Sequence, residues 1–184
     1  VECFGVASPF ADVEVIATGV ALLKSIGLQG DITVKLNSLG TAEDRVVYRA
    51  KLLEYFEPVK DQLSAESRER LSKNPMRILD SKEKEDKPFV EKAPRPIDFL
   101  CATSRKHLQD VKDGLDALDI KYEIDSSLVR GLDYYCHTVF EWVSSDLGAQ
   151  GTVCGGGRYD GLVAQLGGKP TLAAGFAIGV ERLV

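Results

Sequence analysis

The chain has 184 residues, and its 28 Asp and Glu outnumber its 23 Lys and Arg, which gives a formal net charge of −5. This length suits one domain, or one domain with an insertion, that needs no disulfide or metal for stability. The sequence contains no apolar run near the roughly 18 residues of a membrane span, no signal-peptide pattern and no cysteine pair at zinc-site spacing. We expect a cytoplasmic protein with reduced cysteines, no metal bound by its own side chains and no membrane partner.

Glycine and charge divide the chain into three parts. Residues 1–40 contain five of the 17 glycines, and residues 118–184 contain eleven. Residues 41–117 contain a single glycine but 32 of the 51 charged side chains, 16 of each sign. Few glycines and many charges are typical of solvated helices, whereas many glycines and few charges are typical of buried strands. We therefore predict a β-rich core, 1–40 and 118–184, interrupted by a helical insertion, 41–117.

Hydrophobic periodicity predicts the elements of the first half. Apolar residues recur at helical spacing over residues 10–27, and apolar and polar residues alternate over 31–38 as in a half-buried strand. The sequence Thr41-Ala42-Glu43-Asp44 resembles a capping box, which opens a helix that runs toward Phe56. Ser64 is expected to open another short helix.

The second half is predicted to begin with a loop and to end in strands. Residues 80–96 are rich in charge and proline and are predicted to form a loop, and Leu108–Leu118 has helical periodicity. The strands expected after this helix cover residues 120–124, 135–144, 151–156 and 175–179, and the last of them leads into another helix.

The short motifs of common catalytic sites are missing. The segment Cys154–Gly161 reads CGGGRYDG, in which Asp160 stands where a dinucleotide-binding motif has its third glycine, and no P-loop Lys follows. His107 and His137 have no neighbouring pattern of a catalytic triad or a metal site. Three glycines late in a strand leave a shallow floor for a flat ligand; the alternative is a strand packed closely under a helix.

Two arginines occupy unusual positions. Arg130 lies among apolar residues, shortly before Tyr134 and Tyr135. A buried arginine needs a partner, and its planar guanidinium suits a phosphate or a carboxylate. The alternative for Arg130 is a structural ion pair with Asp133. Arg182, near the end of the chain, could equally be a charge on a helix surface.

Five blocks taken together resemble the histidyl-tRNA synthetase family. In chain order they resemble the last strand of motif 2, the insertion domain, the histidine-specific signature, a companion signature and motif 3 of class II synthetases. The blocks are Glu2–Gly5, Asn74–Lys82, Leu128–Glu141, Gly155–Leu162 and Gly175–Leu183. Because they occur in register over essentially the whole chain, the combination is far more specific than any one block.

The resemblance implies a fold and an activity. The fold is α+β, a class II synthetase-like antiparallel β-sheet flanked by helices, with a mainly helical insertion that approaches the acceptor stem of tRNA(His). The family joins histidine to ATP, with Mg²⁺ nearby, and transfers the activated histidine to its tRNA. The full-length parent is expected to be a homodimer.

The resemblance also implies roles for individual residues. Arg130 is the expected catalytic residue, in contact with the α-phosphate of ATP and the substrate carboxylate. Arg182, Gly175 and Gly179 complete the expected ATP site. The residues expected to bind histidine are Glu2, Tyr134, Tyr135, Tyr159, Gly156 and Gly157. A pocket that pairs both imidazole nitrogens can discriminate on the order of 10⁴-fold against other amino acids.

Other interpretations remain open at this point. Motif 1, the motif 2 arginine and the anticodon-binding domain have no counterpart in the sequence, so we expect part of a longer protein, with little or no adenylation by this chain alone. A non-catalytic relative, such as the regulatory subunit of ATP phosphoribosyltransferase, is the main alternative, and a module made of the insertion alone is another. The block that contains Arg130 and Tyr135 favours the enzyme.

The insertion carries a candidate tRNA-binding surface. Its four basic candidates are Arg68, Arg70, Lys73 and Arg77. A basic face made of such residues would neutralise RNA phosphates. The alternative is an ordinary solvated helix face, because the charges of the insertion are balanced.

Overall fold

The computed structural model describes residues 1–28, 32–129, 134–144 and 151–182, without the side chain of Arg182. These residues form a six-stranded sheet with helices, in the strand order β1-β6-β5-β4-β2-β3. The strands are β1 Glu2–Phe4, β2 Ile32–Ser38, β3 Tyr122–Ile124, β4 Cys136–Ser144, β5 Thr152–Arg158 and β6 Ala173–Ile178. The predicted α+β fold is confirmed. No helix of the described ranges combines the length and the apolar character that crossing a membrane requires.

The sheet is mainly antiparallel, as the resemblance implies, and includes one parallel pair. The neighbours β1/β6, β6/β5, β5/β4 and β4/β2 are antiparallel, whereas β2 and β3 are parallel. A parallel pair needs a long crossover connection. The insertion and the helix after it provide that connection, because the chain leaves at the end of β2 and returns at the start of β3.

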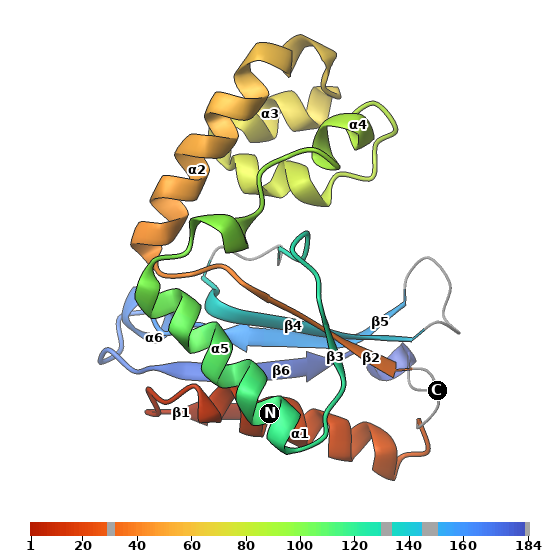
Figure 1. The fold of residues 1–184 in the computed structure, drawn as a ribbon, viewed down its shortest axis with the longest axis vertical. Coiled ribbons are helices and arrows are strands. Elements are labelled where there is room, and N and C mark those ends of the chain that lie inside the picture. The colour runs from red at the N-terminus through yellow and green to blue at the C-terminus, as the bar shows by residue number, and fades with distance from the viewer. Residues whose placement is uncertain (29–31, 130–133, 145–150, 183–184) are drawn as a thin grey trace.

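Two long helices, α1 Phe10–Ser25 and α5 Ala102–Ala117, lie on one face of the sheet (Figure 1). Glycines allow close contact at two points. A Cβ at Gly114 would lie 2.7 Å from Val13, where α5 meets α1, and a Cβ at Gly19 would lie 2.6 Å from Cη2 of the Trp142 ring. The helices and the sheet share one core, whose buried members include Ile16, Leu36, Val111, Leu115, Phe140, Trp142 and Phe176.

The insertion forms a second hydrophobic cluster beyond the sheet, at the top of Figure 1. Its elements are α2 Ala42–Phe56, η1 Glu57–Gln62, α3 Ala65–Lys73, η2 Pro75–Asp80, α4 Lys87–Val90 and η3 Pro96–Phe99. Its buried core contains Tyr48, Leu52, Phe56, Leu63, Leu71, Ile78, Leu79 and Ala93. The predicted boundaries at residues 40 and 117 stay a prediction; the packing of α5 on the sheet favours an insertion that ends near Leu100.

The segment 80–96 differs from the loop that its composition predicts. It contains the single-turn helix α4 and the completely buried Asp86. The Asp86 carboxylate accepts hydrogen bonds from the hydroxyls of Ser64, Ser67 and Ser81, at 2.8, 2.5 and 2.5 Å. Burial opposes its ionisation, but these hydrogen bonds outweigh burial and lower the pKa of Asp86. Asp86 thus fastens α3 and η2 to this segment.

The Asp44 carboxylate links the first and last residues of the insertion, and we call this set of hydrogen bonds the Asp44 clasp. The predicted capping box is confirmed, since Thr41 Oγ1 accepts from Asp44 N and Asp44 Oδ2 accepts from Thr41 N. Asp44 also accepts hydrogen bonds from Cys101 N at 2.9 Å and from Ser104 Oγ at 2.5 Å, at the start of α5. Gly40 has φ +68°, and a Cβ there would lie 2.6 Å from Asp44 Cβ. The two ends of the insertion therefore meet at Asp44.

Candidate functional site

The candidate site lies on the sheet face opposite α1 and α5. Glu2 in β1 pairs with Gly175 in β6, Gly175 pairs with Gly157 in β5, and Gly157 pairs with Val139 in β4. Directly paired residues share one face of a sheet. Two neighbouring glycines therefore lie between Glu2 and Val139, and their lack of side chains lets neighbouring groups lie directly against the backbone.

Three tyrosines lie close together on this face. The Tyr135 ring lies 4.5 Å from that of Tyr134 and 6.4 Å from that of Tyr159, centroid to centroid. A Cβ on Gly157 would lie 2.9 Å from Tyr135 Cδ1, so the small residue lets the ring lie against the strand. Tyr135 and Tyr159 are buried, and each contacts the small hydrophobic cluster on this face.

Glu2 and the tyrosines line a cavity of about 380 Å³. The Tyr159 hydroxyl donates a hydrogen bond to the Glu2 carboxylate. Burial, and next the Glu2 carboxylate, raise the pKa of Tyr159, so the phenol stays protonated at neutral pH. Apart from Glu2 and Tyr159, the lining is largely apolar. It consists of Phe4, Tyr134, Tyr135, Leu162, Val163, Leu166, Gly175, Phe176 and Ala177. The cavity suits a flat ring that carries polar nitrogen atoms.

The glycines of this region differ in their positions. Gly175 lines the cavity, and a side chain there would collide with the Glu2 carboxylate. Gly157 faces the same side, under Tyr135. Gly156 faces the helices, because a Cβ there would lie 2.7 Å from Phe176, which belongs to the helix-covered core. Gly179 follows β6, and its N–H donates to Val153 O. The roles expected for Gly156 and Gly179 stay predictions.

The structure describes neither of the two arginine side chains expected to hold ATP. Arg130 and Asp133, its alternative partner, lie outside the described residues, as does the side chain of Arg182. Among the residues that are described, no three His, Cys, Asp or Glu gather closely enough to hold a metal ion. Mg²⁺ in nucleotide sites depends largely on substrate phosphates and one or two carboxylates, so the expected Mg²⁺ remains a prediction.

A third arginine, Arg158, lies at the end of β5 and is not among the site residues expected from the sequence. It is buried directly behind the site, and its Nη2 lies 2.6 Å from Asp12 Oδ2 in α1. Its Nη1 donates to Asp160 at 3.1 Å and to Val6 O at 3.0 Å. Burial opposes ionisation of Asp12, but hydrogen bonds from His107 and Arg158 outweigh it and lower the pKa of Asp12. This pair fixes β5, and with it Tyr159, against α1.

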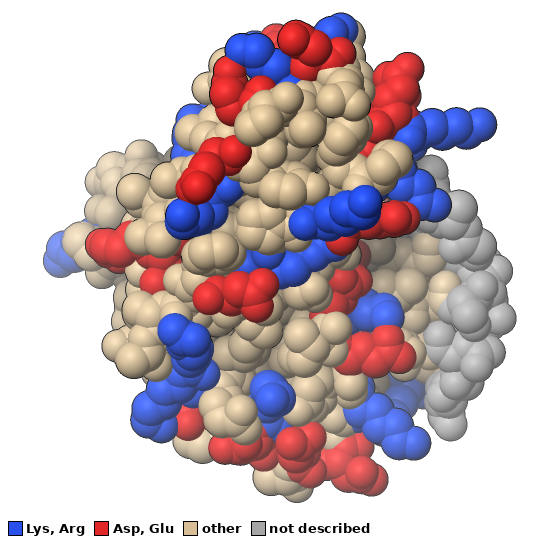
Figure 2. All heavy atoms as spheres, turned by 45° about the horizontal axis from the view of Figure 1, so that its top comes forward, with Lys and Arg blue, Asp and Glu red and all other residues tan. Residues whose placement is uncertain are grey.

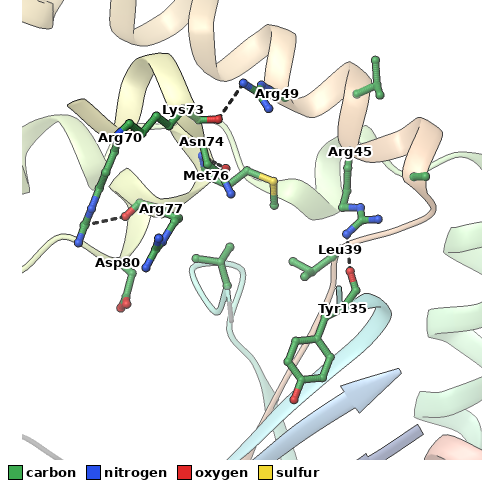
Figure 3. A pocket seen from close by; sticks show the side chains of 13 residues that line it. Leu39, Arg45, Arg49, Arg70, Lys73, Asn74, Met76, Arg77, Asp80 and Tyr135 are labelled. Atoms are coloured by element: carbon green, nitrogen blue, oxygen red, sulfur yellow. Dashed lines mark hydrogen bonds between the residues drawn. The ribbon is translucent and has the colours of Figure 1, made fainter. Parts of the chain in front are cut away.

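A second cavity, of about 300 Å³, lies between the insertion and the sheet, and we call it the cationic groove. Its basic residues are Arg45 and Arg49 from α2, Arg70 and Lys73 from α3, and Arg77 from η2 (Figure 3). Asp80 is the acidic residue among the described residues of its lining. The remaining lining is Leu39, Ala42, Val46, Asn74, Met76, Val129 and Tyr135.

The cationic groove contains three of the four residues of the basic face expected from the sequence. Arg70, Lys73 and Arg77 line it, whereas Arg68, the fourth basic candidate, does not. Arg70 pairs with Glu66 at 2.5 Å and Lys73 with Glu69 at 2.5 Å, which offsets some of the positive charge. Sequence reasoning missed Arg45 and Arg49, because their helix has the balanced charge pattern of an ordinary solvated helix.

The sequence matches one protein family over almost its whole length. A model of the family described as Histidyl-tRNA synthetase matches residues 1–183. The chain belongs to the histidyl-tRNA synthetase family. It is 53% identical, over all 184 of its residues, to Histidine–tRNA ligase of Streptococcus pyogenes serotype M1, and a second S. pyogenes relative, of serotype M5, has the same identity. The chain spans 43% of the length of these curated relatives.

Solved structures of the histidyl-tRNA synthetase family have the same fold. The apo histidyl-tRNA synthetase of S. aureus matches 99% of this chain and 44% of its own, with a TM-score of 0.79 and 38% sequence identity. A protein from Bacillus halodurans, described as an ATP phosphoribosyltransferase regulatory subunit/histidyl-tRNA synthetase, matches with a TM-score of 0.63 and 25% identity, over 99% of this chain and 51% of its own.

Proposed function

We propose that the protein carrying this chain is a histidine–tRNA ligase, which activates histidine with ATP and transfers it to tRNA(His). The supporting observation is the cavity that Glu2, Tyr135 and Tyr159 line together, with Gly175 in the same lining and the Tyr159 hydroxyl bonded to the Glu2 carboxylate. The membership of the histidyl-tRNA synthetase family supports the same activity. This chain contributes the histidine pocket and the insertion.

Recognition of histidine follows from the chemistry of the pocket. A neutral imidazole has one N–H donor and one nitrogen acceptor. In the proposed complex, the Glu2 carboxylate accepts from the N–H, and the Tyr135 hydroxyl donates to the other nitrogen. The hydrogen bond from Tyr159 holds the Glu2 carboxylate in place. Another amino acid would leave these polar groups unpaired, which is the costly outcome that gives such a pocket its selectivity.

Activation of histidine needs positioning rather than a protein base. The substrate carboxylate is itself the nucleophile that attacks the α-phosphate of ATP. The protein must align the two groups and supply positive charge around the phosphates. We propose Arg130 for the α-phosphate and Arg182 for the outer phosphates. ATP brings the leaving pyrophosphate, and Mg²⁺, when bound, adds neutralising charge.

The cationic groove is the proposed docking place for the acceptor stem of tRNA(His). Its five basic side chains stand within one cavity whose lining also includes Tyr135 of the histidine pocket. Phosphate contacts by Lys and Arg supply most sequence-independent affinity for nucleic acid. Homodimer formation and a cytoplasmic location complete the proposal. All four cysteines are free, which fits a reducing compartment.

A regulatory subunit of ATP phosphoribosyltransferase is the second candidate function. The B. halodurans relative carries both descriptions in its name, and it shares the fold. The arrangement of Glu2, Tyr135 and Tyr159 favours the ligase, because an amino-acid pocket with these hydrogen-bonding groups fits the needs of histidine activation. Histidine-dependent exchange of pyrophosphate into ATP separates the candidates, since only the ligase forms an adenylate.

The variant Glu2→Gln tests the histidine pocket. It is made in the protein that contains this chain and has the full length of the curated relatives. Loss of the charged acceptor should raise the KM for histidine by about 10- to 100-fold in pyrophosphate exchange. Glu14→Gln, at an exposed position of α1, is the matched control. An unchanged KM in Glu2→Gln would contradict the pocket, and absence of exchange in the wild type would favour the regulatory subunit.

A further inference from the structure

The histidine pocket and the cationic groove share one wall. Tyr135 is the only one of the described residues that lines both cavities. Its ring extends away from Arg45 and lies against Tyr134, Tyr159 and Gly157 (Figure 3). Its main chain faces the insertion. A shift of this residue would therefore change both cavities at once.

Arg45 holds that wall from the insertion side. The Arg45 Nη1 donates a hydrogen bond of 2.5 Å to the carbonyl oxygen of Tyr135, across 90 positions of sequence (Figure 3). Arg45 is half-buried and lies one turn into α2, directly after Asp44, whose carboxylate links the two ends of the insertion. A hydrogen bond from a guanidinium to a carbonyl oxygen is charge-assisted and stronger than a neutral one. The same side chain lines the groove.

The surroundings of Arg45 make this bond sensitive to an anion. Arg49, Arg70, Lys73 and Arg77 line the same cavity, and Asp80 is the acidic residue among its described lining residues. Glu66 and Glu69 pair with Arg70 and Lys73, but among the described residues around the cavity the positive charges still outnumber the negative ones. The net charge of these described surroundings therefore repels the Arg45 guanidinium. A phosphodiester in the groove removes that repulsion and favours the side-chain position that holds the Tyr135 carbonyl.

We propose that Arg45 is a positioning residue that couples occupancy of the cationic groove by RNA phosphates to the placement of Tyr135 in the histidine pocket. This inference rests on the proposed function and adds a link between its two substrates. Because coupling between two sites is reciprocal, RNA strengthens histidine binding by the same factor by which histidine strengthens RNA binding. In this proposal, the signal from the RNA passes from the Arg45 side chain to the Tyr135 carbonyl oxygen.

The test compares histidine binding with and without an RNA hairpin of the tRNA(His) acceptor stem, in the protein at the full length of its relatives. In the wild type, saturating RNA should lower the dissociation constant for histidine about fivefold. Arg45→Met should abolish this change and raise the histidine dissociation constant without RNA about tenfold. Arg45→Lys, which keeps a charged donor, should restore part of the coupling.

Arg68→Met is the matched control, since it removes the same charge from the same insertion at an exposed position outside the groove. It should keep the full coupling. A second readout uses the 184-residue chain labelled with fluorotyrosine, in which the RNA hairpin should shift the Tyr135 resonance in the wild type and Arg68→Met but not in Arg45→Met.

Two results would overturn the proposal. One is a wild type in which RNA and histidine bind independently, with an unmoved Tyr135 resonance. The other is an Arg45→Met protein that weakens RNA binding alone and leaves histidine affinity and its response to RNA as in the wild type. Failure of the wild type to bind histidine at all would instead contradict the proposed function, and the coupling with it.

Discussion

At the scale of single residues, two histidines without a motif form a stacked pair at the junction of α5 and the sheet. The rings of His107 and His137 lie 4.5 Å apart, nearly parallel at 17°. His107 Nε2 lies 3.3 Å from Asp12 Oδ2. His137 has φ +47°, and its buried Nδ1 has no hydrogen-bond partner among the described residues. Burial, and next His107, lower the pKa of His137.

This lowered pKa predicts a specific dependence of stability on pH. Because the folded state disfavours the charged ring, the stability contributed by neutral His137 is fully present above the unfolded pKa of about 6.5, and it decreases as the pH falls below that value. His137→Asn should flatten the slope of unfolding free energy between pH 7.5 and 5, since asparagine tolerates positive φ and does not titrate. Urea unfolding across this range provides the measurement.

The control for this prediction is His107→Asn, which removes the other ring of the stack and keeps His137. It should leave a pH dependence below pH 6.5, with a smaller slope, because the pKa of His137 is lowered first by its own burial. Identical slopes in His137→Asn and the wild type would contradict the assignment.

At the scale of elements, periodic segments were predictable and buried polar links were not. The helix predicted over 10–27 and the strand predicted over 31–38 are confirmed as α1 and β2, because their apolar residues repeat with one clear period. The segment around Asp86 was predicted as a loop, because a charged residue surrounded by other charges looks solvated in a sequence. Only the structure brings Ser64, Ser67 and Ser81 to it.

The Asp44 clasp gives a prediction for the insertion as an element. Asp44→Ala leaves the N–H groups of Thr41 and Cys101 and the Ser104 hydroxyl without their acceptor. We expect a loss of roughly 3 kcal/mol in the free energy of unfolding, from three donors that lose their acceptor. Thr41→Ala removes only the cap side of the clasp and should cost about 1 kcal/mol.

Urea unfolding of both proteins measures this difference, with the slope m compared to verify that the unfolding remains two-state. Equal destabilisation by Asp44→Ala and Thr41→Ala would mean that the link to α5 contributes nothing. Hydrogen exchange of α5 amides adds a local readout, because only Asp44→Ala should speed exchange at the start of α5.

At the scale of the whole molecule, charges of both signs mix on the face that carries the insertion (Figure 2), whereas basic side chains gather in the cationic groove. Figure 2 shows Lys and Arg interspersed with Asp and Glu over the face that includes the insertion. The net charge of −5 gives no hint of the cationic groove. The groove combines basic residues of α2, α3 and η2, which lie on separate segments of the chain. The glycines that bring Glu2 and Tyr135 close to the sheet, Gly175 and Gly157, belong to segments whose sequence already indicated a site, whereas this groove depended on how the insertion folds back.

The groove predicts the salt dependence of RNA binding. Arg77→Gln removes one groove cation and should make the slope of log affinity against log salt less steep by about one unit, as expected for one lost phosphate contact. Arg68→Gln changes the net charge equally, but it lies outside the groove and should leave the slope as in the wild type. Fluorescence anisotropy of a labelled acceptor-stem hairpin, titrated with the 184-residue chain at several salt concentrations, measures both slopes. If the two variants lower the slope equally, RNA responds to the overall charge of the chain, and the groove has no special part in binding it.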